Sequence, residues 1–254
     1  TSLAGADRTG EHAAHRLPRP PRDATPQANS AWWNGLGQAD RDRLLAEHAE
    51  RIGNLDGLPG AVRDRANRAR FAGEIARLDA ELAAAGDRFR RLADRPPTNR
   101  DVVAEGTQRG LMVELGEQRA ALDAVVRAVA APDRQLLLLD VSGHSAPRAA
   151  VAVGDVDTAD HVAVYTPGFT NRVSTDLPGQ VAGMAGVRDA GRAQLRRTPG
   201  RAGETVAAVA WLGYDIPQID TVTEARRSVL LPGAASRGGA DLSAFYQGID
   251  SSRP

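Results

Sequence analysis

The hydrophobic and polar positions divide the chain into three stretches with different periodicities. Residues 1 to 30 show no apolar repeat and are rich in proline, which predicts a disordered lead-in because they bury too little surface to offset chain entropy. Residues 31 to 131 repeat apolar side chains at spacings of three, four or seven, which is typical of amphipathic helices. Residues 132 to 254 contain short apolar runs that have the length of buried strands.

The helical stretch predicts three helices with breaks between them. We expect helices from about Ala39 to Ile52, from Pro59 to Leu92, and from Gln108 to Ala130. Two glycines and two turn-forming side chains end the first at residues 53 to 57, and Pro96-Pro97 end the second. Arginine and acidic residues alternate between positions 63 and 95, which predicts a solvent-exposed helix face.

The third stretch predicts an α/β sheet. Its apolar runs are QLLLLD at 135–140, RAAVAVG at 148–154, HVAVYT at 161–166 and TVAAVAWL at 205–212. Short loops join the first three runs, whereas about forty residues separate the last two, enough for a crossover helix such as 180–197. We therefore predict an antiparallel hairpin leading into parallel strands, with a further helix at 241–249.

Composition excludes several classes of site. The 254 residues include 32 Asp+Glu and 32 basic residues, all of them arginine, with no cysteine and no lysine. Disulfides, zinc–thiolate sites, cysteine nucleophiles, Walker-type phosphate loops and Schiff-base lysines are therefore excluded. Zero net charge argues against a nucleic-acid partner, and no run of about 20 apolar residues predicts a membrane span. Without a secretion pattern we expect a cytoplasmic location.

Histidine and aspartate positions do not predict a metal site. The five histidines lie at positions 12, 15, 48, 144 and 161, and none pairs at i, i+4 with an acidic ligand nearby. Asp155, Asp157 and Asp160 resemble a cation loop, but the glycine and distal glutamate of a calcium loop are missing. We expect hydrogen-bonded turns there, and we expect no metal.

A Gly-His-Ser sequence follows the first apolar run. Residues 143–147 (GHSAP) begin like the nucleophile motif G-x-S-x-G. That motif needs a small residue two places after the serine and a helix immediately afterwards, but Pro147 and a strand follow here. We interpret the segment as a hairpin turn.

Two segments at the carboxyl ends of predicted strands could line a site. Residues 165–171 (YTPGFTN) follow the third strand, where ligands bind in open α/β sheets and where free backbone N–H groups can stabilise an oxyanion. The alternative is an ordinary turn between a strand and a helix. Past the fourth strand, Trp211, Tyr214 and Asp215 could line a pocket; the alternative is an aromatic plug with Asp215 at a helix cap.

Several motifs together resemble an actinobacterial family of α/β-hydrolase-like proteins of unknown function. They are WWNGL at 32–36, NLDGLP at 54–59, RDRAN at 63–67, RAAVAVG at 148–154, DTADHVAVY at 157–165, PG at 167–168 and AWLGYD at 210–215. The resemblance covers roughly residues 32 to 249. It implies a helical extension at residues 31–131 and, at residues 132–254, the first half of an α/β-hydrolase sheet.

The resemblance also implies a serine hydrolase of the esterase or lipase type. Its nucleophile elbow belongs on the strand after the 241–249 helix, so we expect the nucleophile beyond Pro254 and no catalytic triad residue within this chain. Gly168 and Phe169 are the implied oxyanion-hole segment, although the family more usually has a small residue in place of Phe169. Triad hydrolysis of an acyl substrate needs no cofactor.

Two hypotheses remain open on the sequence. In the first, the chain is the N-terminal part of a serine hydrolase and is inactive alone. In the second, it is a non-catalytic module that acts by binding. In both cases the sheet would end in an open edge, which a second polypeptide could complete.

Overall fold

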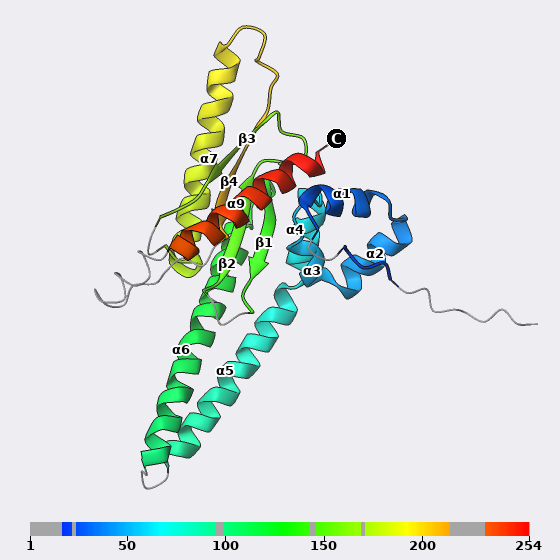
Figure 1. The fold of residues 1–254 in the computed structure, drawn as a ribbon. Coiled ribbons are helices and arrows are strands. Elements are labelled where there is room, and N and C mark those ends of the chain that lie inside the picture. Colours follow the sequence, from blue (N-terminus) through cyan, green and yellow to red (C-terminus); the bar gives the residue numbers. More distant parts are fainter. Residues whose placement is uncertain are drawn as a thin grey trace, which may run out of the picture.

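The fold is known from a computed structural model, which describes residues 17–21, 24–94, 99–142, 146–168, 171–213 and 232–253 (Figure 1). Its helices are α1 (Pro26–Asn34), α2 (Gln38–Glu47), α3 (Ala49–Gly53), α4 (Gly60–Ala69), α5 (Phe71–Ala93), α6 (Asn99–Ala128), α7 (Val173–Arg197) and α9 (Pro232–Ser252). Its strands are β1 (Arg134–Asp140), β2 (Arg148–Val153), β3 (His161–Tyr165) and β4 (Val206–Leu212).

The four strands form one mixed sheet in the order β1-β2-β4-β3. β1 and β2 are antiparallel, β2 and β4 are antiparallel, and β3 and β4 are parallel. Helix α7 makes the crossover between the two parallel strands. The prediction of an α/β sheet in which an antiparallel hairpin leads into parallel strands is confirmed.

Helices cover both faces of the sheet because its strands alternate apolar side chains between two cores. Along β4, Ala208 and Ala210 face a core formed with α5, α6 and α7. Val209 and Trp211 face the other core, which α9 closes. Strands with apolar side chains on both faces require such cover, and Figure 1 shows α9 crossing one side of the sheet.

The outer edge of β1 is covered by side chains of the helical region. Asn54 both donates to the Leu139 carbonyl at 2.8 Å and accepts from the Leu139 N–H at 2.9 Å. Asp64 accepts from the Leu136 N–H at 2.7 Å, and Asn67 donates to the Leu136 carbonyl at 3.2 Å. These side chains take the place of a neighbouring strand, so this edge cannot pair with another chain.

A register shift in β1 allows both Leu136 and Leu139 to meet these side chains. The pairing with β2 is displaced between Leu136 and Leu138. Residues 136 and 139, which are three positions apart, therefore both direct their backbone groups away from β2, although regular strands alternate every second residue. Arg68 extends the cover by donating to the Arg134 carbonyl at 3.0 Å, and Arg70 donates to the Leu139 carbonyl at 2.9 Å.

The prediction of a solvent-exposed charged face from residue 63 is wrong for Arg63 and Arg70, although Arg65 between them is exposed. Arg63 is 2% exposed; it pairs with Asp56 at 2.9 Å and lies over the Phe245 ring. Asn67 and Arg70 are buried as well. Their polar groups can be buried because each meets a backbone carbonyl or a carboxylate, which local sequence spacing does not reveal.

Several element boundaries differ from the sequence expectations. Residues 26–30, expected within the disordered lead-in, form part of α1, where Thr25 accepts from the Ala28 N–H at 3.3 Å as an N-cap. The first predicted helix is broken at His48 into α2 and α3, and the second is broken at Arg70 into α4 and α5. Pro59 precedes α4 as expected, and α6 begins nine residues earlier than predicted.

Helices α5 and α6 form an antiparallel pair that extends well beyond the sheet (Figure 1), and we call this pair the arm. Leu78, Leu115 and Leu122 are buried within the arm and against the sheet. An ion pair between Arg119 and Asp79 at 2.8 Å and a hydrogen bond from Arg88 to Gln108 at 3.0 Å fix the rotation of one helix against the other.

Candidate functional site

The loop after β3 is held in place by an asparagine. Gly168 lies three residues past the end of β3, and Asn171 Nδ2 donates to its carbonyl oxygen at 2.9 Å. This loop stands at the carboxyl end of β3, as predicted. Phe169, the other predicted oxyanion-hole residue, lies outside the described residues.

Helix α7 in turn holds the asparagine. Gln180 Nε2 donates to Asn171 Oδ1 at 2.7 Å. Because the Gly168 carbonyl can only accept, Asn171 must present its NH₂ group to it and its oxygen to Gln180. At the start of α7, Asp176 accepts from the Arg172 N–H at 2.7 Å and so fixes how the loop enters the helix.

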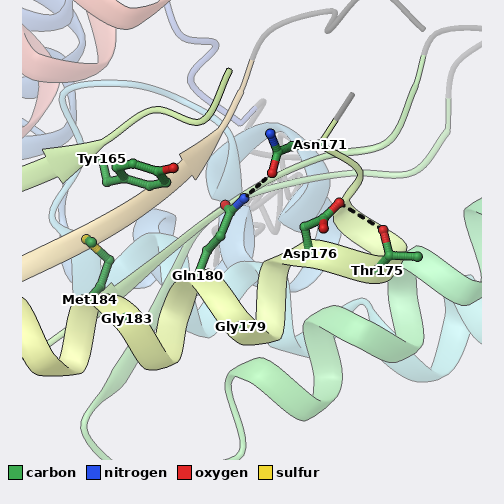
Figure 2. A pocket seen from close by; sticks show the side chains of 8 residues that line it. All are labelled: Tyr165, Asn171, Thr175, Asp176, Gly179, Gln180, Gly183 and Met184. Atoms are coloured by element: carbon green, nitrogen blue, oxygen red, sulfur yellow. Dashed lines mark hydrogen bonds between the residues drawn. The ribbon is translucent and has the colours of Figure 1, made fainter. Parts of the chain in front are cut away.

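A cavity of about 460 Å³, open to solvent, lies beside this loop between β3 and α7 (Figure 2). It is lined by Tyr165, Asn171, Thr175, Asp176, Gly179, Gln180, Gly183 and Met184. Figure 2 shows Gln180 between Tyr165 and Asn171, with the Tyr165 hydroxyl pointing toward it. Asp176 is the charged residue in this lining, and its carboxylate also accepts from the Thr175 hydroxyl at 2.9 Å.

Trp211 lies on the other face of the sheet from this cavity. Its side chain is 2% exposed and belongs to the core under α9, where its ring centroid is 6.0 Å from that of Phe245. The indole also covers Gly213, at which an added Cβ would lie 2.2 Å from it. Tyr214 and Asp215 lie outside the described residues. The structure therefore links Gly168 to the cavity through Asn171, which lines it, and places Trp211 in a core.

The amino ends of β3 and β4 carry a separate charged cluster. Glu204 lies 2.5 Å from His161 Nε2 and 2.7 Å from an Arg201 nitrogen. Hydrogen bonds from Arg201 first, and then from His161, lower the pKa of Glu204 from 4.5 to about 2. This cluster stabilises the end of the sheet opposite the Gly168 loop.

The aspartates at 155–160 serve as hydrogen-bond acceptors, for nearby groups and for segments distant in the chain. Asp155 accepts from the Asp157 N–H at 2.9 Å, as expected for a hydrogen-bonded turn. Asp157 accepts from the first N–H groups of α4, those of Gly60 at 2.6 Å and Ala61 at 2.9 Å. No group of His, Asp and Glu within the described ranges could hold a metal ion.

Sequence reasoning did not single out Gln180. It lies on the crossover helix, nine residues after Asn171, at a position where an amide side chain is unremarkable for a helix surface. Its role becomes visible only when the loop folds back onto α7. The Gly-His-Ser segment at 143–145 lies outside the described residues.

Comparison with known proteins identifies the family likeness of the sheet region. Residues 142–254 match the family model described as alpha/beta hydrolase. This region is α/β-hydrolase-like. Strands β2, β3 and β4 and the loop at the carboxyl end of β3 lie within the matched residues, and β1 ends just before them.

Two mycobacterial proteins are similar to the chain in sequence. Over 242 residues the chain is 30% identical to the uncharacterized protein Rv2079 of Mycobacterium tuberculosis. The aligned region covers 91% of this chain and 34% of that protein. Over 140 residues the chain is 36% identical to the uncharacterized protein Mb0988c of Mycobacterium bovis. This aligned region covers 54% of this chain and 48% of that protein. The chain thus spans about a third of the length of the first relative. No solved structure matches it significantly.

Within the described residues, no helix combines the length and apolar character that crossing a bilayer requires.

Proposed function

We propose that this chain forms the N-terminal part of a serine hydrolase that cleaves an acyl substrate of the ester type. The observation that carries the proposal is the fixed Gly168 loop at the carboxyl end of a parallel strand, in a region that matches the α/β hydrolases. Catalytic groups of open α/β sheets gather at this end. Backbone N–H groups of Gly168 and Phe169 would stabilise the oxyanion that forms when a serine attacks the acyl carbonyl.

The course of α9 supports a nucleophile supplied from outside this sequence. Tyr246 donates to the Val164 carbonyl at 3.4 Å near the carboxyl end of β3, and Arg253 donates to the Ala159 carbonyl near its amino end. Helix α9 therefore runs back along β3, antiparallel to it. A strand that followed Arg253 would start beside the amino end of β3 and could pair with it in parallel, which would bring its carboxyl end to the Gly168 loop.

The sequence itself is consistent with a nucleophile supplied from outside it. The 254 residues contain no G-x-S-x-G motif. The nucleophile would then be a serine of a following strand, with histidine as its base and an acidic residue to orient the histidine. Residues 168–171 would contribute the oxyanion donors and their support.

A fluorophosphonate probe, which labels activated serines, tests the proposal. We expect no labelling and no turnover of p-nitrophenyl acetate by the 254-residue chain, and labelling of one serine in a longer natural protein that contains it. In that protein Gly168→Pro should reduce p-nitrophenyl acetate turnover at least ten-fold, because it removes a backbone donor. Turnover by the 254-residue chain that Gly168→Pro abolishes would contradict the proposal.

A binding role for the β3 edge is the second candidate. Because the His161 N–H donates to the Thr205 carbonyl at 3.1 Å, the backbone groups of Val162 and Val164 point away from β4. This edge lies opposite the covered β1 edge and can accept a strand of a second polypeptide.

Proline at position 162 tests that role. Val162→Pro removes an outward N–H, so strand addition at β3 should be lost while the sheet stays folded. Ala163→Pro removes a donor to β4 and should unfold the sheet. An unlabelled longer protein, together with a strand-binding activity that Val162→Pro abolishes, would favour this second role over hydrolysis.

A further inference from the structure

The outer face of α6 in the arm carries a cluster of exposed valines. Val102, Val103 and Val113 are 58%, 70% and 70% exposed, and they are half of the large apolar side chains that are strongly exposed in the described residues. Gly106 and Gly110 lie between them with open space where a Cβ would project. Residues 103, 106, 110 and 113 follow helical spacing, so they form one stripe, which we call the valine stripe.

The valine stripe continues a face of α6 that is already covered nearer the sheet. One helical repeat beyond it, Glu117 accepts from the Ser174 hydroxyl of α7 at 2.5 Å, and Ala121 and Ala124 are completely buried. The same face therefore packs against other elements from residue 117 onward, whereas no part of the chain that the structure describes covers it between residues 102 and 113. Helix α5 does not supply the cover, because its contacts with α6 reach Gln108 and Arg119, which lie on the opposite side of α6 from the stripe.

The stripe is complementary to a second copy of itself. Its pattern, valine-glycine-glycine-valine at 103, 106, 110 and 113, is symmetric about residue 108. An antiparallel two-fold pairing of two α6 helices would set Val103 against the partner copy's Val113, and Gly106 against the partner copy's Gly110. Glycines at the crossing allow the backbones to approach closely, and a two-fold interface uses the same patch on both copies.

The charges beside the stripe match this pairing. Arg109 and Glu105 lie on the same flank of the stripe, one helical turn apart. The guanidinium of Arg109 lies over the Phe89 ring of α5. Under the two-fold, the backbones of Arg109 and of the other copy's Glu105 lie at nearly the same height along the axis, so these opposite charges come near each other across the crossing. The arm carries both signs of charge along its length, which suits another copy of the arm better than a strongly anionic partner such as nucleic acid.

We propose that the arm is a homodimerisation element in which two α6 helices cross antiparallel at the valine stripe to form a four-helix bundle with their α5 partners. The proposal does not depend on hydrolase activity or on strand addition at β3.

Sedimentation velocity of the 254-residue chain between about 1 and 200 μM tests dimerisation. We expect a monomer–dimer equilibrium, and we expect Val103→Glu and Val113→Glu each to raise the dissociation constant at least ten-fold, because each places a carboxylate against a valine of the other copy, without a partner of opposite charge. Val187→Glu is the matched control, since Val187 of α7 is 43% exposed but lies outside the arm, and it should leave the constant unchanged. A monomer at every concentration, or equal effects of the arm and control variants, would overturn the proposal.

Disulfide trapping tests the direction of pairing without relying on loss of association. The native chain has no cysteine, so introduced cysteines react without background. A mixture of Val103→Cys and Val113→Cys chains should form a disulfide-linked heterodimer on mild oxidation. Either variant alone should not, because equivalent positions would be about 15 Å apart along the crossing and disulfides need Cα atoms within about 7 Å. Linking of each variant with itself, but not with the other, would refute the antiparallel arrangement.

Discussion

Gly57 and Asn67 each contact a segment that is distant in the chain. Gly57 has a φ of 95°, and a Cβ there would lie 2.0 Å from the Pro26 carbonyl oxygen. Asn67 is fully buried and donates to the carbonyls of Gly53 at 2.8 Å and Leu136 at 3.2 Å. Each residue is required by a contact with a segment that is distant in the chain.

Substitution of Gly57 should separate backbone strain from a steric clash. Gly200 also has a positive φ, 80°, but a Cβ there would meet open space. We expect Gly200→Ala to lower the free energy of unfolding by about 1 kcal/mol, the cost of the left-handed conformation alone. Gly57→Ala should cost more than about 3 kcal/mol because the Pro26 segment must also move. Equal costs in urea unfolding would show that the close approach is absent.

Asn67→Ala should leave the buried Leu136 carbonyl without its side-chain donor. We expect it to reduce the free energy of unfolding by about 2–4 kcal/mol, because that carbonyl cannot reach water instead and the Gly53 carbonyl keeps the longer bond from Arg63 at 3.3 Å. Asn34→Ala on the exposed side of α1 is the control and should cost less than about 0.5 kcal/mol. Chemical denaturation measures both, and a loss at Asn67 no greater than that at Asn34 would contradict the assigned hydrogen bonds.

The ends of helices and strands depend on carboxylates that come from other elements. Asp157, in the connection between β2 and β3, accepts from the first N–H groups of α4. It therefore joins the helical region to the sheet and also satisfies donors that a helix start leaves free. At the amino ends of β3 and β4, the Glu204 carboxylate pairs with Arg201 and His161.

Removal of the Asp157 cap should destabilise the protein through α4. We expect Asp157→Ala to lower the free energy of unfolding by about 1–2 kcal/mol, as for other helix N-caps, and Asp157→Asn to cost less because one acceptor oxygen remains. The exposed Asp42→Ala on α2 is the control. Thermal unfolding with equal midpoints for Asp157→Ala and Asp42→Ala would contradict a capping role.

Acid should weaken the Glu204 cluster in a defined pH range. Because the folded pKa of Glu204 is lowered to about 2 from 4.5, its carboxylate stabilises the folded chain above pH 4.5, and this contribution is lost as pH falls toward 2. We expect Glu204→Gln to flatten the pH dependence of stability between pH 4.5 and 2, whereas Glu47→Gln on exposed α2 should not. Superimposable pH profiles of the native and Glu204→Gln chains would rule this out.

At the scale of the whole molecule, the two edges of the sheet differ in how far other elements cover them. The β1 edge is covered by side chains of α3 to α5 and the segments between them. At the β3 edge, the described residues place the Tyr246 hydroxyl of α9 beside the outward carbonyl of Val164. A sheet closed on one side and open on the other can be extended in one direction only. The helical region therefore directs any further strand to β3, next to the Gly168 loop.

Amide hydrogen exchange should report this asymmetry. The N–H groups of Leu136 and Leu139 donate to Asp64 and Asn54, so they should exchange at least ten-fold more slowly than those of Val162 and Val164. The measurement is made by NMR on the 254-residue chain at low concentration. Asn54→Ala should speed exchange at Leu139 far more than at the amides of β4. Rapid exchange along the whole of β1 would contradict the cover by the helical region.

Local periodicity was sufficient to predict the strands and the sheet. All four strands lie where apolar runs predicted them, because strands buried on both faces need continuous apolar residues. The Gly168 loop was also predictable, since it follows directly from a strand end. Breaks at His48 and Arg70 were not, because apolar spacing continues through both positions.

Only the tertiary structure decided what the polar residues do. The motif residues Asn54, Asp64 and Asn67 resemble ordinary helix and turn residues in the sequence, but they meet a strand more than 60 residues away. Gln180 acquires its role from a loop folded back onto its helix. The physical reason is that apolar burial follows from periodicity along one element, whereas the burial of a polar group depends on which distant donor or acceptor it meets.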